Sequence, residues 1–443
     1  MNNANEFPIV PLTSFIKHSL EILKNPLPFH RKNFENLGDT FQLNIGFKTH
    51  IFFSRDAKLL EYVLQKNQKN YTKSKIQTKE VAKYLGKGLL TAEGEHWKKQ
   101  RKLIQPAFHK QKIKELLTTI QEQIRDNYSL LKTNNKFDVF PIFNDLAFQV
   151  VAKALFSSTS KKKDIAQLQH ITEGSQRMLV KELRQPYLGW WFSLSGKIQE
   201  YKNLTEDARQ ILKKIVEQRK KSNVRFNDLL DLLLDSKYDD GSAMEEKQLM
   251  DEILILFVAG HETTSNSLTF TSQLLAQHPE WQELIFKEAK TLNENNDDLM
   301  EIVGQSKICQ QVIEESMRLY PPAYFIDRLN YKTDAYNGIK IKPQSDLLFS
   351  IYEIHRHPKL WKNPEQFQPE RFENGSRVYS SQYFPFGAGP RKCIGNNFAM
   401  FEMIIAVREM VLNYKIKPQF ATIGITPLIT LKPNNAYLEL EKR

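Results

Sequence analysis

The sequence FGAGPRKCIG, residues 386–395, is the stretch that decides the fold. It places Cys393 in a glycine-rich loop, with Arg391 two residues before the cysteine and Phe386 seven residues before it. A helix is expected to begin shortly after this loop. Loop amides and a nearby helix N-terminus can donate hydrogen bonds to a thiolate, and the helix dipole favours the negative charge. The pattern therefore indicates a cysteine thiolate that is held against a metal.

Five spaced positions of this stretch would coincide by chance in on the order of one chain in ten thousand. They are Phe386, Gly389, Arg391, Cys393 and Gly395. The run resembles the heme-binding loop of the cytochrome P450 family, the heme-thiolate monooxygenases, and Ala399 and Glu402 extend the match. The resemblance implies heme b (iron protoporphyrin IX) as the cofactor and Cys393 as the metal ligand. A thiolate ligand pushes electron density onto heme iron and favours O–O cleavage. Without the resemblance, a buried structural cysteine in a turn is the alternative.

Upstream of the loop, residues 251–277 are predicted to form a long helix. Inside it stands the hexapeptide Ala259-Gly260-His261-Glu262-Thr263-Thr264. Glycine in a helix interior costs about 1 kcal/mol relative to alanine, so we expect Gly260, with Ala259, to let a flat ligand approach the backbone. The hexapeptide resembles the oxygen-binding groove of the family. This implies that Thr263 holds bound oxygen by a hydrogen bond and that Glu262 relays protons. A surface-facing Glu262 and a packed threonine on a core helix are the alternative.

A further set of residues would hold the cofactor. Trp97 and Arg101 are four residues apart on a predicted helix and share a face. Indole N–H and guanidinium groups only donate hydrogen bonds, so by resemblance both would bind a heme propionate, as would Arg391. Arg328 matches another propionate-binding arginine of the family, with an ordinary surface arginine as the alternative. Phe386 is expected to contact the heme as well.

A predicted ion network would support the cysteine loop. Glu315 and Arg318 are three residues apart on one predicted helix, a pair worth only about 0.2–0.5 kcal/mol when exposed. The family resemblance implies that they form a buried network with Arg371 instead. Arginine suits such a site because its planar fork satisfies several acceptors at once. We interpret His355 and His357 as structural residues at a strand end.

The composition agrees with an ordinary globular protein that has a large core. The chain has 443 residues, of which 41% are hydrophobic and 26% charged. Its only cysteines are Cys309 and Cys393, which argues against a disulfide framework and for a reducing compartment. No apolar run approaches the roughly 20 residues of a membrane-spanning helix, and no signal peptide is evident. We therefore expect a soluble, cytoplasmic protein of the bacterial type within the family.

The net charge of +12 raises nucleic acid as a partner. The lysines are dispersed and no nucleic-acid fold signature is present, so we expect no nucleic acid and no membrane. By resemblance, a ferredoxin-type electron donor would dock on the cysteine side of the heme. Candidate docking residues are Lys98, Lys99, Lys102 and Lys392. The donor would work with an NAD(P)H-dependent reductase, and we expect the protein to be a monomer.

The fold is expected to be mainly α with a small β-sheet region, in one domain over residues 1–443, with residues 1–30 loosely packed. The predicted elements are strands at 41–47 and 50–54, a helix from Asp56 to Gln65, mostly helix over 94–276, a strand at 347–350, a helix at 397–414, and strands near 428–432 and 436–440. By resemblance this is the cytochrome P450 fold, a triangular helical prism with heme between the long central helix and the cysteine loop.

The substrate is predicted only as a class. Candidate recognition segments include polar residues 71–90, whose lysines we interpret as solvated loop, an aromatic stretch with Tyr187, Trp190 and Trp191, and Tyr324 with Phe325. One prediction is hydroxylation of a fatty acid or terpenoid by O2. The other is oxidative O-demethylation of a methylated sugar, with formaldehyde release. The Lys-, Asn- and Ile-rich composition resembles flavobacterial chains, among which the family includes 6-O-methyl-galactose demethylases.

Two alternatives of another kind stay open at this point. The first is a heme protein that binds a ligand without catalysis, a sensor, which would need no Glu262–Thr263 proton relay. The second is a zinc site, which a single cysteine without a His or Cys partner at ligand spacing does not make.

Overall fold

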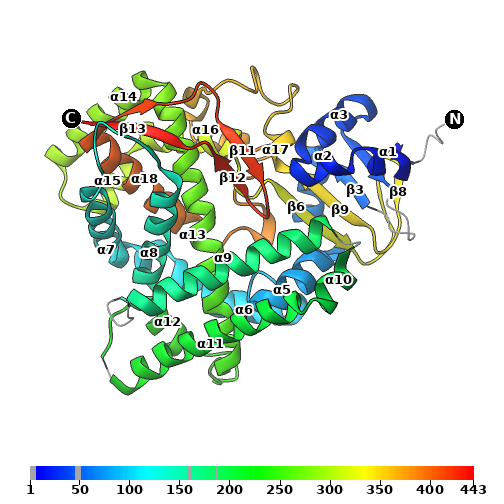
Figure 1. Ribbon diagram of the computed structural model, residues 1–443, viewed down its shortest axis with the longest axis horizontal. Coiled ribbons are helices and arrows are strands. Elements are labelled where there is room, and N and C mark those ends of the chain that lie inside the picture. Colours follow the sequence, from blue (N-terminus) through cyan, green and yellow to red (C-terminus); the bar gives the residue numbers. More distant parts are fainter. Residues whose placement is uncertain (1–5, 45–50, 158–161, 186–187, 223) are drawn as a thin grey trace. The chain divides into compact units, whose positions relative to one another are not determined.

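The computed structural model describes residues 6–44, 51–157, 162–185, 188–222 and 224–443 (Figure 1). The chain divides into two compact units. The first contains Met1–Ile76, Glu314–Cys393 and Ile425–Lys432, and the second contains Gln77–Ile313, Ile394–Gly424 and Pro433–Arg443.

The first unit is built on a six-stranded sheet. Its helices are α1 (Leu12–Lys17), α2 (Ser19–Lys24), α3 (Leu27–Leu37), α4 (Ala57–Glu61) and α17 (Ile351–Ile354), with short 3-10 or π turns at Tyr62–Lys66, Gln68–Asn70, Pro369–Phe372, Ser376–Tyr379 and Gly389–Arg391. Its strands are β1 (Ile9–Val10), β2 (Thr40–Leu43), β3 (Ile51–Ser54), β4 (Tyr71–Thr72), β6 (Phe325–Asn330), β7 (Asp334–Tyr336), β8 (Ile339–Ile341) and β9 (Asp346–Ser350). The sheet order is β1-β2-β3-β9-β6-β4, and β7 pairs with β8.

This sheet joins strands that are almost 300 residues apart in the sequence. Strand β3 pairs in parallel with β9, and β9 pairs antiparallel with β6. The predicted helix at Asp56 is confirmed, because its carboxylate accepts the amides of Lys58 and Leu59 at 2.8 and 3.1 Å and so caps α4. The predicted strand 41–47 is confirmed as far as Leu43, and residues 45–50 lie outside the described part. Within the predicted loosely packed segment, Val10 and Phe29 are buried.

The second unit is mostly helical. Its helices are α5 (Ala82–Leu85), α6 (Gly94–Ile104), α7 (Lys110–Ser129), α8 (Phe140–Phe156), α9 (Lys162–Arg184), α10 (Gly189–Leu194), α11 (Lys197–Ser222), α12 (Leu229–Asp235), α13 (Glu246–Gln277), α14 (Pro279–Asn295), α15 (Leu299–Gln305) and α18 (Asn396–Asn413), with short turns at Ile76–Val81 and Gln105–Phe108; α16 (Lys307–Leu319) begins in this unit and ends in the first. Strands β5 (Lys136–Asp138), β10 (Tyr414–Pro418) and β13 (Tyr437–Lys442) form a sheet in the order β10-β13-β5, and β11 (Gly424–Pro427) pairs with β12 (Leu431–Asn434).

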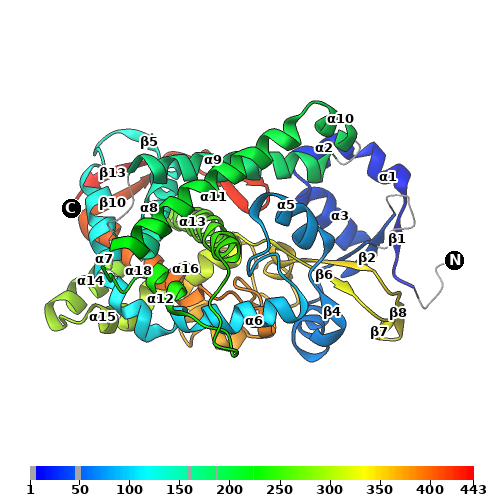
Figure 2. The ribbon, with the colours of Figure 1, turned by 90° about the horizontal axis from the view of Figure 1, so that it is seen from below.

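Helix α13 is the long helix predicted from the hexapeptide, and it forms the core of the second unit. It packs along α8, and α11 lies against both α13 and α9 (Figures 1 and 2). Its buried residues, both apolar and polar, cover most of the helix circumference, as expected of a helix that other elements surround. The predicted helix after the cysteine is also confirmed, as α18. The sequence did not predict β5 or β11.

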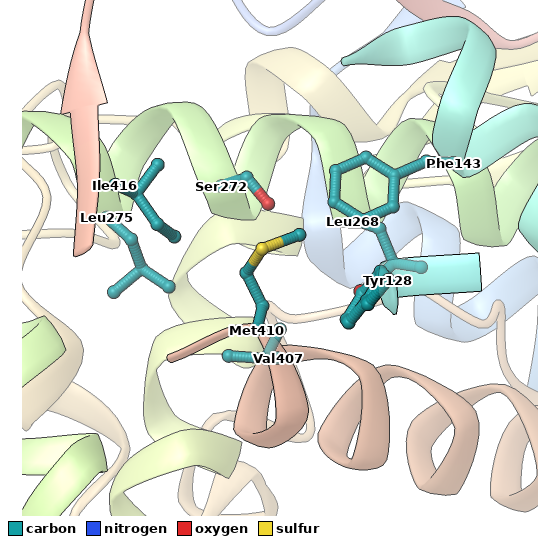
Figure 3. A pocket seen from close by; sticks show the side chains of 8 residues that line it. All are labelled: Tyr128, Phe143, Leu268, Ser272, Leu275, Val407, Met410 and Ile416. Carbon is teal, nitrogen blue, oxygen red and sulfur yellow. The ribbon is translucent and has the colours of Figure 1, made fainter. Parts of the chain in front are cut away.

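A small gap lies between α13, α18 and α7 (Figure 3). It encloses about 180 Å³ between mainly apolar side chains and does not admit a water-sized sphere. The lining residues are Tyr128, Phe143, Leu268, Ser272, Leu275, Val407, Met410 and Ile416. This is a packing gap in the core, and its size and lining give it no chemistry.

Candidate active site

The cysteine loop is a tight turn that leaves its thiol accessible. The amide of Cys393 donates to the carbonyl oxygen of Phe386 at 2.9 Å, which closes the loop, and the Cys393 side chain is exposed. Gly387 and Gly389 have φ of +68° and +69°, a region that favours glycine. A Cβ on Gly389 would lie 2.0 Å from the backbone oxygen of Leu64, so only glycine fits there.

The predicted ion network has a fully buried pair, Glu315 and Arg318, and Arg371 at its edge is partly buried. Arg318 binds Glu315 through two N–H groups, at 2.7 and 2.8 Å, and Nε of Arg371 binds the same carboxylate at 3.3 Å. Arg318 also donates to the backbone oxygen of His355 at 2.7 Å. The ring of His355 in turn accepts the amide of Phe384 at 2.9 Å. The network therefore reaches the residues that enter the cysteine loop through a continuous set of hydrogen bonds.

His355 acts in this chain of contacts as a neutral acceptor. Burial, followed by the positive charges of Arg318 and Arg356, lowers the pKa of His355 well below its usual value. The interpretation of His355 as structural agrees with these contacts. His357 is also buried, and its Nε2 lies 3.0 Å from the carboxylate of Asp39.

On the other side of Cys393, the chain enters the second unit. Helix α18 begins at Asn396, three residues after the cysteine, so its amide end carries partial positive charge close to this position in the sequence. Ile394 packs against a cluster formed by Leu89, Ala92 and Trp97. The cysteine is thus followed at once by a residue that packs against the cluster containing the predicted propionate-binding tryptophan.

The predicted propionate residues occupy different environments. Trp97 is buried on α6, and Arg101, one turn later, is half-buried with Nε donating to Gln105 at 3.1 Å. Arg391 is half-buried at the end of the short turn before the cysteine. Arg328 is 8% exposed on β6 and donates to the backbone oxygen of Asp327 at 2.7 Å, so the alternative of a surface arginine is wrong.

Helix α13 carries one open stripe. Within residues 249–276, all of them described, every side chain is buried except Leu256, Ala259, Gly260 and Thr263. These positions follow the spacing i, i+3, i+4, i+7, so they line one face of the helix. The face is apolar apart from one hydroxyl group. A ligand of flat, mainly apolar character fits such a stripe, which interrupts an otherwise enclosed helix.

The hydroxyl and the acid of the hexapeptide differ in exposure. Thr263 Oγ1 donates to the carbonyl oxygen of Ala259 at 2.8 Å, the i−4 bond expected of a threonine inside a helix. Glu262 is only 4% exposed, so the alternative of a surface-facing glutamate is wrong. Gly260 also has a packing role, because a Cβ there would lie 2.9 Å from Cγ2 of Val151 on α8.

Several predicted recognition residues do not line an open surface. Tyr324 is buried and its hydroxyl donates to the backbone oxygen of Leu428 at 2.7 Å. Phe325 packs edge-on against Phe53 in the core of the first unit. Lys73 is 7% exposed, so its interpretation as solvated loop is wrong. Tyr324 and Phe325 thus contact residues that are distant in the sequence.

The aromatic stretch gives the opposite result. Trp190 and Trp191 on α10 are 63% and 51% exposed, and Tyr187 lies outside the described residues. An aromatic cluster is more often core or channel wall than a recognition surface, but within the second unit these two tryptophans are exposed, while Phe192 of the same helix is buried.

The lysines predicted to dock an electron donor border a surface cleft of about 580 Å³. Lys98, Lys99 and Lys102 line it, but Lys98 pairs with Glu95 at 2.5 Å and Lys102 pairs with Asp239 at 2.7 Å. The positive charge of this cleft is therefore partly balanced. Lys392 is exposed in the first unit.

Sequence reasoning missed two acidic residues that open the buried part of α13. Asp251 and Glu252 are buried, and their carboxylates accept the amides of Lys87 and Leu89 at 2.9 and 2.7 Å. Two signals in the sequence could have indicated this contact. One is the pair of consecutive acids near the start of a largely apolar helix segment, and the other is the Gly-Lys-Gly sequence at residues 86–88.

The described part of the chain contains no group of three His, Cys, Asp or Glu residues that could hold a metal ion, so the zinc alternative finds no ligand set there. No helix among the described residues is both long and apolar enough to span a bilayer. Cys309 is buried and unpaired with Cys393, as the expected lack of a disulfide framework requires.

Comparisons with known proteins agree on one family. The cytochrome P450 family model matches residues 8–440. The 11-oxo-beta-amyrin 30-oxidase of Glycyrrhiza uralensis is 31% identical over 405 residues, covering 86% of this chain and 76% of that protein. The cyclooctat-9-en-7-ol 5-monooxygenase of Streptomyces melanosporofaciens is 27% identical, covering 92% of this chain and 88% of that protein.

A solved structure shares the fold. The crystal structure of the cytochrome P450DA heme domain superposes with a TM-score of 0.86, at 18% identity, covering 99% of this chain and 98% of that one. Members of this family contain heme and use O2, a redox partner and a small-molecule substrate. This protein therefore belongs to the cytochrome P450 family and is a heme-dependent monooxygenase.

Proposed function

We propose that this monooxygenase holds heme b through Cys393 and hydroxylates a lipophilic substrate of the terpenoid class. The open stripe on α13 carries the proposal: three of its four residues, Leu256, Ala259 and Gly260, are apolar, and the fourth supplies a hydroxyl group. An apolar stripe suits a hydrocarbon substrate better than a sugar, whose hydroxyl groups need hydrogen-bond partners. The named reactions of the two relatives, on amyrin and cyclooctatin compounds, support the same class.

The residues present fit the heme. Cys393 offers an exposed thiol in a loop that Gly389 keeps close to the backbone at Leu64. When bound, the heme supplies O2 binding and the oxidation of the substrate C–H bond. We assign Trp97, Arg101, Arg328 and Arg391 to the propionates, as cationic or N–H donors. Phe386, Ala259 and Gly260 would contact the macrocycle.

Thr263 and Glu262 would deliver protons to the reaction: Thr263 through its hydroxyl group and Glu262 as a proton relay. The Thr263 hydroxyl donates to Ala259, and its lone pairs are available to accept a hydrogen bond within the stripe. To donate there, the hydroxyl must give up its bond to Ala259. Glu262 is the adjacent acid, and its burial means that protons reach it through neighbouring polar groups or water and not directly from bulk solvent.

We further propose a ferredoxin-type donor, supplied by an NAD(P)H-dependent reductase, for the two electrons of each turnover. An acidic donor suits the exposed Lys98, Lys99, Lys102 and Lys392. Because Lys98 and Lys102 are paired with acids, we expect only moderate salt dependence of the electron-transfer rate. We also propose that the protein works as a single-domain monomer in the cytoplasm.

The first experiment is the absorption spectrum of the reduced protein under carbon monoxide. The red-shifted Soret band of thiolate-ligated ferrous heme is expected, and Cys393→Ala should lose it. A band typical of a neutral ligand in well-folded wild-type protein would contradict Cys393 as thiolate ligand and would bring the sensor alternative forward.

The second experiment tests Thr263. Thr263→Ala should keep heme but divert electrons to hydrogen peroxide, and tight coupling of electrons to product would contradict its role. Thr269→Ala is the matched control, since Thr269 makes the same i−4 bond at 2.7 Å on the same helix but is fully buried away from the stripe.

The third experiment separates the substrate classes. Polycyclic terpenoids and 6-O-methyl-galactose are added in turn to the ferric protein, and the heme spin state is measured. A ferredoxin, its reductase and NAD(P)H are then added in air, and product and formaldehyde are measured. Hydroxylated terpenoid without formaldehyde supports the proposal. Formaldehyde release from the methylated sugar would contradict it and would support O-demethylation.

A further inference from the structure

We propose that Asp251 and Glu252 are positioning residues for the heme edge of the second unit, because they fasten the turn at residues 86–92 onto α13. This inference rests on the proposed role of Trp97 at the heme. The turn connects α5 with α6, the helix that carries Trp97. Both acids lie in the first turn of the buried part of α13. Asp251 is four residues before Ile255, and Glu252 is three residues before it.

The two carboxylates bind different backbone amides of the turn. Asp251 Oδ2 accepts the amide of Lys87 at 2.9 Å, and Glu252 Oε2 accepts the amide of Leu89 at 2.7 Å. Gln248, one turn earlier on the same helix, donates to the carbonyl oxygen of Lys87 at 3.0 Å and to Glu252 at 2.8 Å. Hydrogen bonds to a charged acceptor are roughly twice as strong as neutral ones, so these contacts hold the turn firmly.

Glycines let the turn approach so closely. A Cβ on Gly86 would lie 2.1 Å from the carboxyl carbon of Asp251, and Gly86 also has φ of +81°. A Cβ on Gly88 would lie 2.8 Å from Glu252 Oε2 and 2.8 Å from Ile255 Cδ1. The close approach of the two acids therefore requires both glycines of the Gly-Lys-Gly sequence.

Asp251 also ties a third element into this contact. Its Oδ1 accepts Nε of Arg209, on α11, at 2.9 Å. A separate contact holds α5, where Lys83 Nζ and the Tyr84 hydroxyl bind Glu182 on α9 at 2.6 and 2.5 Å. The segment before α6 is thus fastened to α9, α11 and α13 through two acidic centres.

The turn passes this constraint to the heme-binding residue. Leu89, whose amide binds Glu252, packs in one cluster with Ala92 and Trp97, and Ile394 contacts that cluster next to the cysteine. Released from α13, the turn would no longer hold Leu89 and Ala92 against the indole. We therefore expect the acids to set how firmly Trp97 holds the heme, without contacting heme or substrate themselves.

Trypsin cleavage of the holoenzyme after Lys87 measures release of the turn. The Lys87 side chain is exposed, but its amide and carbonyl oxygen are both bound, so cleavage needs local opening. Asp251→Asn and Glu252→Gln should raise cleavage after Lys87 about tenfold relative to cleavage after Lys290, an exposed lysine of α14 that reports global unfolding. Glu246→Gln, an exposed acid on the same helix that pairs with Lys213, is the control and should match wild type.

Heme transfer to excess apomyoglobin gives the second readout. Both variants should lose heme several-fold faster than wild type and keep the thiolate-type carbon monoxide spectrum, since Cys393 is untouched. Gly88→Ala should act alike by displacing the turn while both acids remain, and Gly304→Ala, where a Cβ meets nothing within 4 Å, is its control.

Three outcomes decide the question. Faster cleavage together with faster heme loss supports the positioning role. Cleavage at the wild-type rate, or faster cleavage with heme loss at the wild-type rate, overturns it. If wild-type protein itself lacks the thiolate-type spectrum, the proposed function fails, and this result is independent of the cleavage ratios.

Discussion

The backbone N–H of Phe384 donates to Nε2 of His355 at 2.9 Å, and this bond joins the buried Glu315–Arg318 pair to the entrance of the cysteine loop. His355 has its backbone oxygen on Arg318 and its ring on Phe384, so one residue serves both sides. The loop that presents Cys393 therefore depends on a neutral histidine as well as on glycine geometry.

Replacing His355 with leucine should weaken the loop. The change leaves the amide of Phe384 buried without its acceptor, which costs about 1–3 kcal/mol in the free energy of unfolding. We also expect the thiolate-type carbon monoxide spectrum to convert faster to the neutral-ligand form. Urea unfolding and the time course of this spectrum measure both effects.

The matched control is His357→Gln, in the same turn, whose ring binds the half-exposed Asp39 instead of the loop. It should leave the carbon monoxide spectrum as stable as in wild type. If His357→Gln and His355→Leu convert at the same rate, the bond to Phe384 has no special part in holding the loop.

Gly389 and Gly387 should respond differently to alanine. Both have positive φ, which costs an alanine roughly 1–2 kcal/mol. Gly387→Ala meets only Ile326 Cδ1 at 3.8 Å and should lose about this amount of stability, whereas Gly389→Ala also overlaps the backbone oxygen of Leu64. We expect Gly389→Ala to bind heme poorly, as judged by heme content after purification. Equal heme content in the two variants would mean that the loop can move away from Leu64.

The sequence predicted those parts of the site that depend on local patterns. Three features are of this kind: the cysteine loop, the long helix with Thr263, and the Glu315–Arg318 pair. Within each feature, the residues that matter are close together in the chain. Their geometry follows from glycine conformations and helix periodicity, which a sequence displays directly. Arg371 is 56 residues from Glu315, so its part in the network was predicted from the family resemblance alone, and the ion pair confirms it.

The parts that the sequence did not predict depend on contacts between distant segments. The partly buried Phe325 meets Phe53, from a strand more than 270 residues earlier, because β6 and β3 both pair with β9. Asp251 and Glu252 bind a turn more than 160 residues away. Helix periodicity marks these acids as interior positions but names no partner for them, and a buried acid is costly until its partner is known.

His30 should make the protein sensitive to mild acid. Burial lowers the pKa of His30 to about 3, and its Nδ1 has no hydrogen-bond partner among the described residues. The folded pKa lies below the usual value near 6.5, so the stabilising contribution is full above pH 6.5 and is lost as the pH falls below it. Between pH 7 and pH 5, one such histidine lowers the free energy of unfolding by about 2 kcal/mol.

His30→Phe should remove this part of the pH dependence. A phenyl ring fits the aromatic neighbours Phe53 and Phe325, whose rings lie 4.7 and 5.4 Å from that of His30. Urea unfolding at pH 7 and pH 5 measures the slope, in a range above the usual titration of carboxylates. The exposed His170 gives the control, His170→Phe, which should keep the wild-type slope. An unchanged slope in His30→Phe would show that this ring is not held neutral.

Glu402 and Glu409, seven residues apart on α18, should respond in opposite directions to glutamine. Burial raises the pKa of Glu402 well above its usual value, and neither carboxylate oxygen has a hydrogen-bond partner among the described residues. A raised acid pKa means that stability falls as the pH rises above the unfolded value near 4.3. Glu402→Gln should therefore stabilise the protein at pH 7, on the order of 1–3 kcal/mol.

Glu409 differs because its carboxylate accepts Arg125 and Gln121, both at 2.8 Å. Glu409→Gln weakens these contacts and should cost about 1 kcal/mol, since the guanidinium of Arg125 is itself largely exposed. Urea unfolding at pH 7 and pH 5 separates the two effects: the gain in Glu402→Gln should shrink at pH 5, whereas the loss in Glu409→Gln should persist. If Glu402→Gln also destabilises at pH 7, its carboxylate must have a partner in the folded protein, and α18 would then carry a second bound acid.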